Sequence, residues 1–332
     1  MRVLILSHDD VKRALPPEEC ADAMARVLAM RARGEAYNPL RSVMVPPGAA
    51  GFMGLMPGWR AAGDDAPASF ALKAICLIPD NPSRGLDTHQ GIVTLFDGEI
   101  GVPTAILDAS AITDVRTAAV TAVATRALAR EDARTLAILG AGVQARSHLR
   151  ALLTVRDFDT VRVYAPTAEH AQAVLEDAPA VSAGTNLTLA ASAEEAVRGA
   201  DVVLTATSSK TPVLQRDWLG PGVHVNAVGA STPSARELDV ETVVASSLFC
   251  DSRESLAAEA GEYRLALEQG AIDGDHVRAE LGEVLIGERP GRRDDRELTL
   301  FRSLGIAVED LAAAEYAVAA ARRHGFGTEV EL

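Results

Sequence analysis

The sequence has few cysteines and no long apolar run. Its three cysteines, Cys20, Cys76 and Cys250, are far apart, with no C-x-x-C pair and no histidine at ligand spacing. This pattern indicates neither a disulfide framework nor a structural zinc site, and we expect three reduced thiols in the core. No apolar stretch approaches the ~20 residues of a membrane span. The apolar run in the opening MRVLILSHDD is too short for a signal peptide, so we expect a cytoplasmic protein.

The chain also has fewer basic than acidic residues. The chain has 32 lysines and arginines against 46 aspartates and glutamates, which gives a net charge of −14. Such a balance argues against non-specific binding to nucleic acids or anionic membranes. With 332 residues, 48% of them hydrophobic, the chain is a globular protein long enough for two domains. Any anionic ligand must therefore meet locally placed arginine or lysine side chains.

The first segment, to about residue 115, mixes predicted strands and helices. The run RVLIL (2–6) predicts a short strand, and Ser7 with Asp10 forms an S-x-x-D signal for the start of a helix. A Pro-Pro pair opens a second predicted helix, which Gly34 ends. Three further runs, separated by Pro, Asn and Gly, predict a meandering sheet. They are SFALKAICLIP (69–79), GIVTLFD (91–97) and VPTAILD (102–108).

From about residue 117 to 300, predicted strands alternate with helical stretches. This arrangement is typical of a parallel sheet covered by helices. The strand-like runs are TLAIL (135–139), VRVYA (161–165), LTLAA (187–191), DVVLTAT (201–207), HVNAVG (224–229) and SLFCD (247–251). The last segment, 300–325, is alanine-rich and predicts one long helix that ends at Gly325.

A glycine turn stands in the first of these strand–helix units. The stretch LAILGAGVQARSHLRAL (136–152) runs from an apolar strand into a helix, with Gly140 and Gly142 at the turn. Gly140 permits a tight turn, Gly142 lets the backbone approach a pyrophosphate, and Ala145 is small enough for close helix–strand packing. The context therefore predicts a dinucleotide site at the N-terminus of the helix.

The type of dinucleotide is less sharply indicated. An NAD site normally has an acidic residue after its second strand, where this chain has Ala165, Pro166 and Thr167. The missing carboxylate favours NADPH, although no arginine stands there to bind a 2′-phosphate. An S-adenosylmethionine methyltransferase also has a glycine-rich first turn, but its turn usually lies near the start of its domain.

Several ordered stretches resemble one family, the ornithine cyclodeaminase/mu-crystallin family, over essentially the whole chain. The matching stretches are NPLRSVM, GLMPGW, ALKAICLIPDNPSRGLDTHQGIVTLFD, GVPTAILDASAITDVRTAAVTAVATRAL, LAILGAGVQARSHL, VNAVGASTPSARELD and LFRSLGIAVEDLAAAEYA. The resemblance implies an α/β protein with a doubly wound Rossmann domain (117–303) that binds NAD(P). It also implies a discontinuous α/β domain for substrate binding and dimerisation (1–116 with 304–332), and hence a homodimer.

The resemblance assigns roles to particular residues. Arg41, Lys73 and Arg116 stand at the family's positions for the substrate carboxylate, and the lysine also lies near the reacting carbon. His89 and Met56 are further substrate-binding candidates. Lys73 stands in an apolar run, where an unpaired ammonium would be costly unless an anion met it. The expected cofactor-binding residues are Thr88, Thr117, Gly140, Gly142, Val143, Gln144, Ala165, Thr167, Thr205, Thr207, Val228, Gly229 and Ser303.

The sequence departs from the cyclodeaminase pattern at two positions. Cyclodeaminases and the related alanine dehydrogenases have an aspartate where Ser231 stands, and the lysine expected four residues later is replaced by Ala235. A neutral hydroxyl cannot handle the proton of the substrate amine as a carboxylate does. Ser231 can instead hydrogen-bond an imine nitrogen, or a water that protonates it. We therefore expect Lys73, Arg116 and Ser231 to be the catalytic residues of an imino-acid reductase.

Candidate substrates of such a reductase are pyrroline-2-carboxylate, piperideine-2-carboxylate or an acyclic imine formed from a keto acid and an amine. Two enzymatic alternatives remain, an alanine-type amino-acid dehydrogenase and ornithine cyclodeaminase, and the missing aspartate counts against both. A third alternative is a non-catalytic, NADPH-dependent small-molecule binding protein. The intact set of Arg41, Lys73 and Arg116 favours an enzyme over this binding protein.

Overall fold

The computed structural model describes residues 1–63, 66–178 and 184–331. Contacts between residues divide the chain into two compact units. The first unit joins Met1–Arg116 to Gly305–Leu332, so both ends of the chain belong to it, and the second unit is Thr117–Leu304. Helix α3 (Ala109–Leu128) begins in the first unit and ends in the second.

The first unit is built on a mostly antiparallel sheet with the strand order β16-β1-β7-β6-β5-β4-β2, in which β3 also pairs with β4. Strands β5 to β7 form the antiparallel meander that the sequence predicts, and β4, which was not predicted, extends the meander by one strand. The strands are β1 (Arg2–Leu6), β2 (Ala36–Tyr37), β3 (Ser42–Met44), β4 (Phe52–Arg60), β5 (Ser69–Leu77), β6 (His89–Asp97), β7 (Pro103–Asp108) and β16 (Thr328–Glu331).

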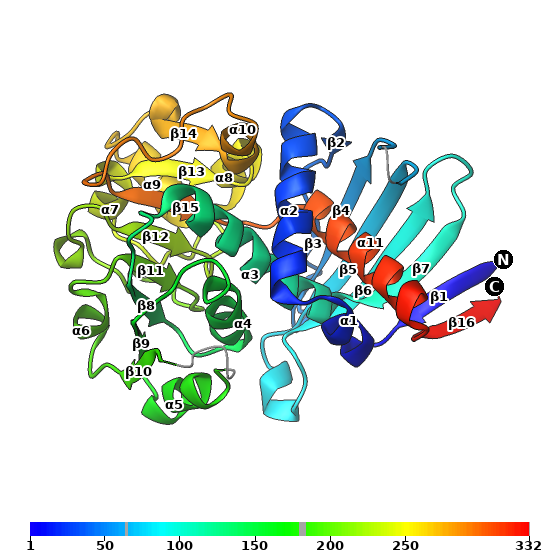
Figure 1. The fold of residues 1–332 in the computed structure, drawn as a ribbon, viewed down its shortest axis with the longest axis horizontal. Helices are drawn as coiled ribbons and strands as arrows, with labels where there is room; N and C mark the ends of the chain where they lie inside the picture. The colour runs from blue at the N-terminus through cyan, green and yellow to red at the C-terminus, as the bar shows by residue number, and fades with distance from the viewer. Residues whose placement is uncertain (64–65, 179–183, 332) are drawn as a thin grey trace. The chain divides into compact units, whose positions relative to one another are not determined.

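Helices cover one face of this sheet. Helix α11 (Ala307–His324) packs against β4, β5 and β6, with α2 (Pro17–Ala32) at its side (Figure 1). The remaining helical elements are α1 (His8–Ala14) and the short 3₁₀ helix η1 (Asn81–Arg84). Ser7 caps α1 as predicted, and Gly325, with a φ of 70°, ends α11.

The prediction of one helix over 300–325 is wrong at its beginning. Residues Thr299–Arg302 form strand β15 of the second unit, and α11 begins only at Ala307. The four residues of β15 are fully buried, and they pair on both sides with neighbouring strands. Tertiary pairing therefore overrides the helical pattern that the alanine-rich continuation suggests.

The second unit contains a wholly parallel sheet with the strand order β10-β9-β8-β11-β12-β15-β13-β14. All six predicted strands are present, and β14 and β15 are additional. Their bounds are β8 (Thr135–Leu139), β9 (Thr160–Tyr164), β10 (Asn186–Leu189), β11 (Val202–Thr205), β12 (His224–Ala227), β13 (Ser247–Cys250), β14 (Val277–Glu280) and β15 (Thr299–Arg302). The strand order reverses at β8, which lies between β9 and β11, and such a switch point is where doubly wound sheets bind ligands.

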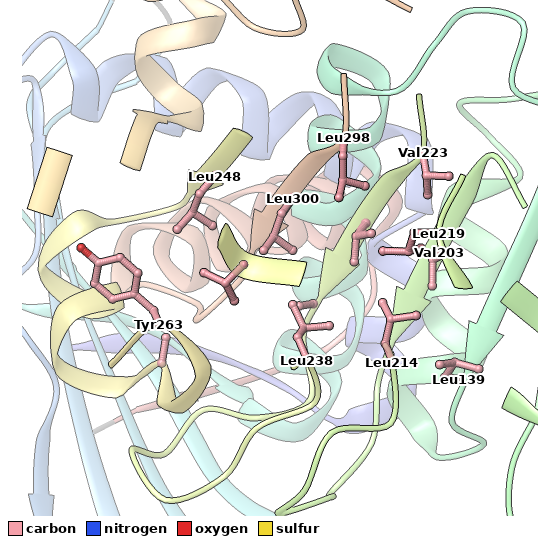
Figure 2. Close-up of a cluster of buried hydrophobic side chains, with 14 of the residues drawn as sticks. Leu139, Val203, Leu214, Leu219, Val223, Leu238, Leu248, Tyr263, Leu298 and Leu300 are labelled. Atoms are coloured by element: carbon pink, nitrogen blue, oxygen red, sulfur yellow. The ribbon is translucent and has the colours of Figure 1, made fainter. Parts of the chain in front are cut away.

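Helices pack on both faces of this parallel sheet. Residues alternate along each strand, so Leu139 and Val203 face one apolar cluster while Ile138 and Leu204 face the other. Figure 2 shows the first cluster, which Tyr263 of α9 joins from the helix side. The helices and 3₁₀ helices are α4 (Val143–Leu152), α5 (Ala168–Glu176), α6 (Ala193–Val197), η3 (Arg216–Trp218), α7 (Val240–Ala245), α8 (Arg253–Glu259), α9 (Gly261–Glu268), η4 (Gly274–His276) and α10 (Leu281–Leu285).

The structure can be compared with the expectations from composition about the three cysteines and about membrane-spanning segments. All three thiols are free, as predicted; Cys20 and Cys250 are buried, whereas Cys76 is only half-buried on β5. Across the described ranges, no helix combines the length and the apolar character needed to cross a bilayer.

Candidate functional site

Lys73 lies at the centre of the inward face of β5. Because side chains alternate along a strand, Ala71, Lys73 and Ile75 share the face that is covered by α11, and all three are buried. The Lys73 side chain is 2% exposed, and its neighbours in register are Met56 on β4 and Val93 on β6. An unpaired ammonium would be costly here, so the partners of Lys73 determine what the site can do.

Two acidic residues at the start of α11 pair with the buried cations. The Lys73 Nζ atom donates to Asp310 Oδ1 at 2.9 Å and to the Thr113 hydroxyl at 3.3 Å. Arg116, on α3, donates from Nε to Asp310 Oδ1 at 2.9 Å and from Nη1 to Glu309 Oε2 at 2.9 Å. The Asp310 carboxylate therefore bridges the two cations, and Glu309 pairs with Arg116.

A glycine brings the start of α11 against Arg116. Gly305 has a φ of 74°, and a Cβ atom there would lie 2.5 Å from Arg116 Nη1. The Gly305 carbonyl accepts a hydrogen bond from Arg41 Nη2 at 2.9 Å. The Glu309 carboxylate also accepts a bond from the backbone N–H of Ile306, just before the helix, at 3.3 Å. The three cations predicted from the sequence therefore converge on one turn of the chain.

Burial and neighbouring charges shift the pKa values in this cluster. Burial lowers the pKa of Lys73 to about 8; Arg116 and Arg41 add to the decrease, and Asp310 opposes it. For Asp310, burial alone would raise the pKa, but the attraction of Lys73 and Arg116 outweighs burial and leaves the pKa below its ordinary value. Lys73 is therefore charged at neutral pH and loses its proton in mildly alkaline solution.

Thr88 immediately precedes β6, and His89 is the first residue of this strand. His89 is half-buried, and burial together with the charges of Lys73 and Arg116 lowers its pKa to about 4. The imidazole is therefore neutral at pH 7 and can both donate and accept a hydrogen bond. The Thr88 carbonyl accepts a bond from the Ile78 N–H at 3.0 Å. Thr88 belongs to the first unit, whereas the other predicted cofactor residues belong to the second.

The glycine turn of the second unit joins β8 to α4 at the switch point of the sheet. Gly140 has a φ of 129°, and a Cβ atom there would lie 2.3 Å from the carbonyl oxygen of Ala206. A Cβ atom at Gly142, by contrast, would have no atom of the described chain within 4 Å. Val143 is 52% exposed, and Ala145 is buried in the core between helix and sheet. The turn is therefore tight at Gly140 and open at Gly142.

A buried carboxylate organises the ends of two neighbouring strands. The Glu237 side chain accepts hydrogen bonds from the Thr205 hydroxyl at 2.9 Å, the Thr207 N–H at 2.6 Å, the Thr207 hydroxyl at 2.8 Å and the Gly229 N–H at 2.7 Å. A Cβ atom at Gly229 would lie 2.1 Å from the Thr207 carbonyl oxygen. Burial raises the pKa of Glu237, and Arg302 and these hydrogen bonds oppose the increase. Glu237 thus ties the end of β11 to the end of β12.

The remaining predicted residues lie on α3 or just after strands of the second unit. Thr117 is buried on α3, and Thr167 precedes α5, two residues after the partly buried Ala165. Ser231 is exposed in the loop that follows β12 and Val228. Ser303 is buried directly after β15, and its N–H donates to the Ala227 carbonyl at 3.0 Å.

The residues at this edge of the sheet fit a dinucleotide. The N-cap residue of α4 is Gly142, which has no side chain to accept from the first N–H groups of the helix, and these groups suit an anion such as a pyrophosphate. Within the described ranges, the buried Ser303 Oγ and Gln144 Oε1 atoms have no hydrogen-bond partner. Buried polar atoms of this kind normally have a partner, and the hydroxyls and amide of a nucleotide can supply one.

Three acidic residues of these two clusters are not singled out by the sequence analysis. Glu309 and Asp310 stand in the first turn of an otherwise apolar helix start, GIAVEDLAAA, and Glu237 stands in SARELD. A carboxylate pair inside such an apolar run is the one signal that points to buried partners. The partners themselves, more than 190 residues earlier in the case of Arg116, can be identified only from the fold.

Comparisons with known proteins extend over both units. The model of the ornithine cyclodeaminase/mu-crystallin family matches residues 1–324. Ketimine reductase mu-crystallin of Rattus norvegicus is 39% identical over 282 residues, which cover 85% of this chain and 84% of that protein. The structure of Thermococcus litoralis Delta(1)-pyrroline-2-carboxylate reductase in complex with NADH and L-proline is 35% identical, with a TM-score of 0.93, over 99% of this chain and 100% of that one.

A third similar structure is an archaeal alanine dehydrogenase dimer with bound NAD. It is 31% identical, has a TM-score of 0.92 and covers 100% of both chains. These matches confirm the resemblance indicated by the sequence motifs. The chain belongs to the ornithine cyclodeaminase/mu-crystallin family.

Proposed function

We propose that this protein is an NAD(P)H-dependent reductase of imino acids that carry a carboxylate next to the C=N bond. The observation that carries the proposal is the cation cluster, in which Lys73 and Arg116 are buried, share one carboxylate and lie in the same unit as Arg41. The likeness to the Thermococcus pyrroline-2-carboxylate reductase and to rat ketimine reductase supports the reaction class.

The first unit has the groups that would bind and orient the substrate. The guanidinium groups of Arg41 and Arg116 can each form forked hydrogen bonds with a carboxylate, and Lys73 adds a compact positive charge beside the reacting carbon. The neutral His89 can hydrogen-bond the substrate, and Met56, in register with Lys73, supplies apolar contact. These residues fix the position of the C=N carbon, which is the main demand of the reaction on the protein.

The second unit has the groups that would hold the cofactor. A bound reduced nicotinamide supplies the hydride that the C=N carbon accepts. Gly140 and Gly142 allow a close backbone approach, and the free N–H groups of α4 suit the pyrophosphate. Thr205, Thr207 and Gly229 are held by Glu237 at the edge of the sheet where dinucleotides cross.

Ser231 is the residue that separates the candidate reactions within the family. As a neutral hydroxyl it can hydrogen-bond the imine nitrogen, or a water that protonates this nitrogen. It cannot take up the proton of an amine at pH 7, which the release of ammonia from ornithine or alanine would require. This argues for imine reduction over ornithine cyclodeamination and alanine oxidation. The intact cation cluster argues for an enzyme over a small-molecule binding protein.

We also propose a preference for NADPH over NADH. The support for this preference is the absence of a carboxylate after β9, at residues 165–167, where it would repel a 2′-phosphate. The ratio of kcat/KM for the two cofactors tests the preference. A ratio above one is expected, and a ratio below one contradicts it.

A second copy of the chain is the proposed partner, as in the archaeal alanine dehydrogenase dimer. The outward face of the meander is apolar: Leu55 on β4, Phe70 on β5 and Ile92 on β6 are 37%, 46% and 45% exposed. Neighbouring pairs such as Phe70 with Trp59 and with Phe96 extend this face. Sedimentation at twice the chain mass of 34.8 kDa is expected, and a stable monomer would contradict the proposal.

The reaction itself is tested by following the near-ultraviolet absorbance of NADPH, and then of NADH, with the purified protein. Separate wells contain cyclic imino acids, pyruvate with ammonia, pyruvate with methylamine, and ornithine with NAD, the last assayed for released ammonia. Rapid oxidation with a cyclic or acyclic imine is expected. Ammonia released from ornithine alone would contradict the interpretation of Ser231.

A further inference from the structure

A single buried carboxylate serves both of the buried cations proposed to meet the substrate. The Asp310 side chain is 1% exposed and accepts from Lys73 Nζ and from Arg116 Nε, each at 2.9 Å. Glu309, next to it, accepts from Arg116 Nη1 and from the backbone of Ile306. The contacts of Asp310 therefore include both cations, and those of Glu309 include Arg116 and the helix start.

The groups around Lys73 come from four elements. Asp310 faces it from α11, Arg116 and Thr113 from α3, Arg41 from the segment before β3, and His89 from β6. Burial and the two arginines favour the neutral amine, and Asp310 favours the ammonium. His89 is neutral at pH 7 and adds no charge. The charge of Lys73 near neutral pH therefore depends on the carboxylate of α11.

We propose that Asp310 is a positioning residue of the reductase: its carboxylate keeps the Lys73 ammonium charged and fixes the guanidinium of Arg116, so that both cations meet the substrate carboxylate. This inference rests on the proposed function. It assigns a role to the start of α11, 237 residues after Lys73 in the sequence.

The inference predicts a particular pH dependence. Since Lys73 has a pKa of about 8, the affinity of the protein for a carboxylate should fall as the pH rises through this value. Removal of the Asp310 charge leaves burial, Arg116 and Arg41 to act on Lys73 unopposed. The alkaline limb of the pH profile, where affinity falls as the pH rises, should then move to lower pH. The reason is that the Lys73 amine loses its proton at a lower pH.

The test measures binding and not turnover, so it is independent of whether the imine is reduced. Calorimetry gives the Kd of pyrrole-2-carboxylate, a planar analogue of a cyclic imino acid, with the NADPH-loaded protein between pH 6 and pH 9. The variants are Asp310→Asn, the matched Glu309→Gln, and Asp310→Glu, which keeps the charge. A failed reductase assay together with normal carboxylate binding would count against the proposed function and leave the role of Asp310 in carboxylate binding intact.

Asp310→Asn is expected to shift the alkaline limb by at least about one pH unit to lower pH and to weaken binding about tenfold at pH 7.5. Glu309→Gln is expected to keep the limb at its wild-type pH, and Asp310→Glu is expected to restore it. An Asp310→Asn limb at the wild-type pH would overturn the inference. If Asp310→Asn does not fold, Lys73→Arg decides, because an arginine stays charged: the limb must vanish, and its persistence would overturn the inference.

Discussion

The candidate sites of the two units consist of different kinds of chemical groups. In the first unit, the site consists of ionic side chains from β5, α3 and α11, buried together and paired at 2.9 Å. In the second unit, the site consists mainly of backbone: two glycines at a turn, an uncapped helix N-terminus, and strand ends tied by Glu237. The first arrangement suits a small carboxylate, which needs charge, and the second suits a long dinucleotide, which needs shape and N–H donors.

This difference has a consequence for stability. Removal of one member of the first cluster leaves another charge buried without its partner, which costs about 3–5 kcal/mol in well-buried pairs. In the second unit, the cost of a substitution depends on whether an added atom meets the backbone. Substitutions can therefore be chosen to damage either the fold or the binding.

Within the second unit, the largest expected effect separates two glycines of the same turn. Gly140→Ala places a Cβ atom 2.3 Å from the Ala206 carbonyl oxygen at a φ of 129°, and should destabilise the second unit by about 3 kcal/mol. Gly142→Ala meets no atom of the described chain and should change the free energy of unfolding by less than about 1 kcal/mol. It should still weaken NADPH binding about tenfold, because its methyl group occupies the space next to the pyrophosphate.

Thermal unfolding and NADPH titration of the two variants check this prediction. A Gly140→Ala protein as stable as the wild type would contradict the account of the turn. Unchanged NADPH affinity in Gly142→Ala would contradict the cofactor assignment.

The second prediction concerns acid stability of the second unit. His224 is fully buried, with Nδ1 at 2.9 Å from Thr299 Oγ1 and Nε2 at 3.1 Å from Asn226 Oδ1. Burial, with Arg292 and Arg156 adding to it, lowers its pKa to about 3 from an ordinary 6.5. Between these values the unfolded chain binds the proton and the folded chain does not, so stability is lost as the pH falls from 6.5 towards 3.

Each such group changes the free energy of unfolding by at most about 1.4 kcal/mol per pH unit. The free energy of unfolding, measured with urea between pH 6.5 and pH 4.5, should therefore depend less steeply on pH in His224→Gln than in the wild type. The exposed His170 offers a matched control, and His170→Gln should keep the wild-type slope. Equal slopes in all three proteins would show that His224 does not stay neutral in the folded state.

The smallest expected effect concerns the carboxylate that ties the strand ends. In Glu237→Gln, the side-chain NH₂ group cannot accept, so some of the donors of Thr205, Thr207 and Gly229 lose their partner. The KM for NADPH should rise about tenfold while the KM for the imine stays within about twofold. Steady-state kinetics measures both constants. The exposed Glu241 on α7 provides the control Glu241→Gln, and an equal change in both constants would assign Glu237 to general stability.

The same contrast explains what could be predicted from the sequence. The turn of Gly140 and Gly142 is local, so a strand, two glycines and a helix in order are enough to recognise it. Six of the eight strands of the parallel sheet, and strands β5 to β7 of the meander, follow from apolar runs bounded by turn residues. Strand β15 could not be predicted because its four residues are followed closely by an alanine-rich helix. Only its pairing with β12 and β13 identifies it as a strand.

The acidic half of the first cluster could not be predicted for a different reason. Arg41, Lys73 and Arg116 were found through family motifs, but nothing local marks Asp310 as their partner. The bond between Lys73 and Asp310 spans 237 residues, and it forms only because α11 returns from the end of the chain to cover β5. Glu237 is hidden in the same way, since its hydrogen bonds reach back 32 residues to Thr205.

The most direct test of the central claim compares the wild type with the double variant Lys73→Ala, Arg116→Ala. The oxidation of NADPH by a cyclic imino acid is followed for both proteins, together with the Kd for NADPH. If the cation cluster binds the substrate carboxylate and the second unit binds the cofactor, kcat/KM should fall at least about a thousandfold, with NADPH affinity within about threefold of the wild type. Steady activity in the double variant would contradict the claim, because the imine would then be reduced without the two cations.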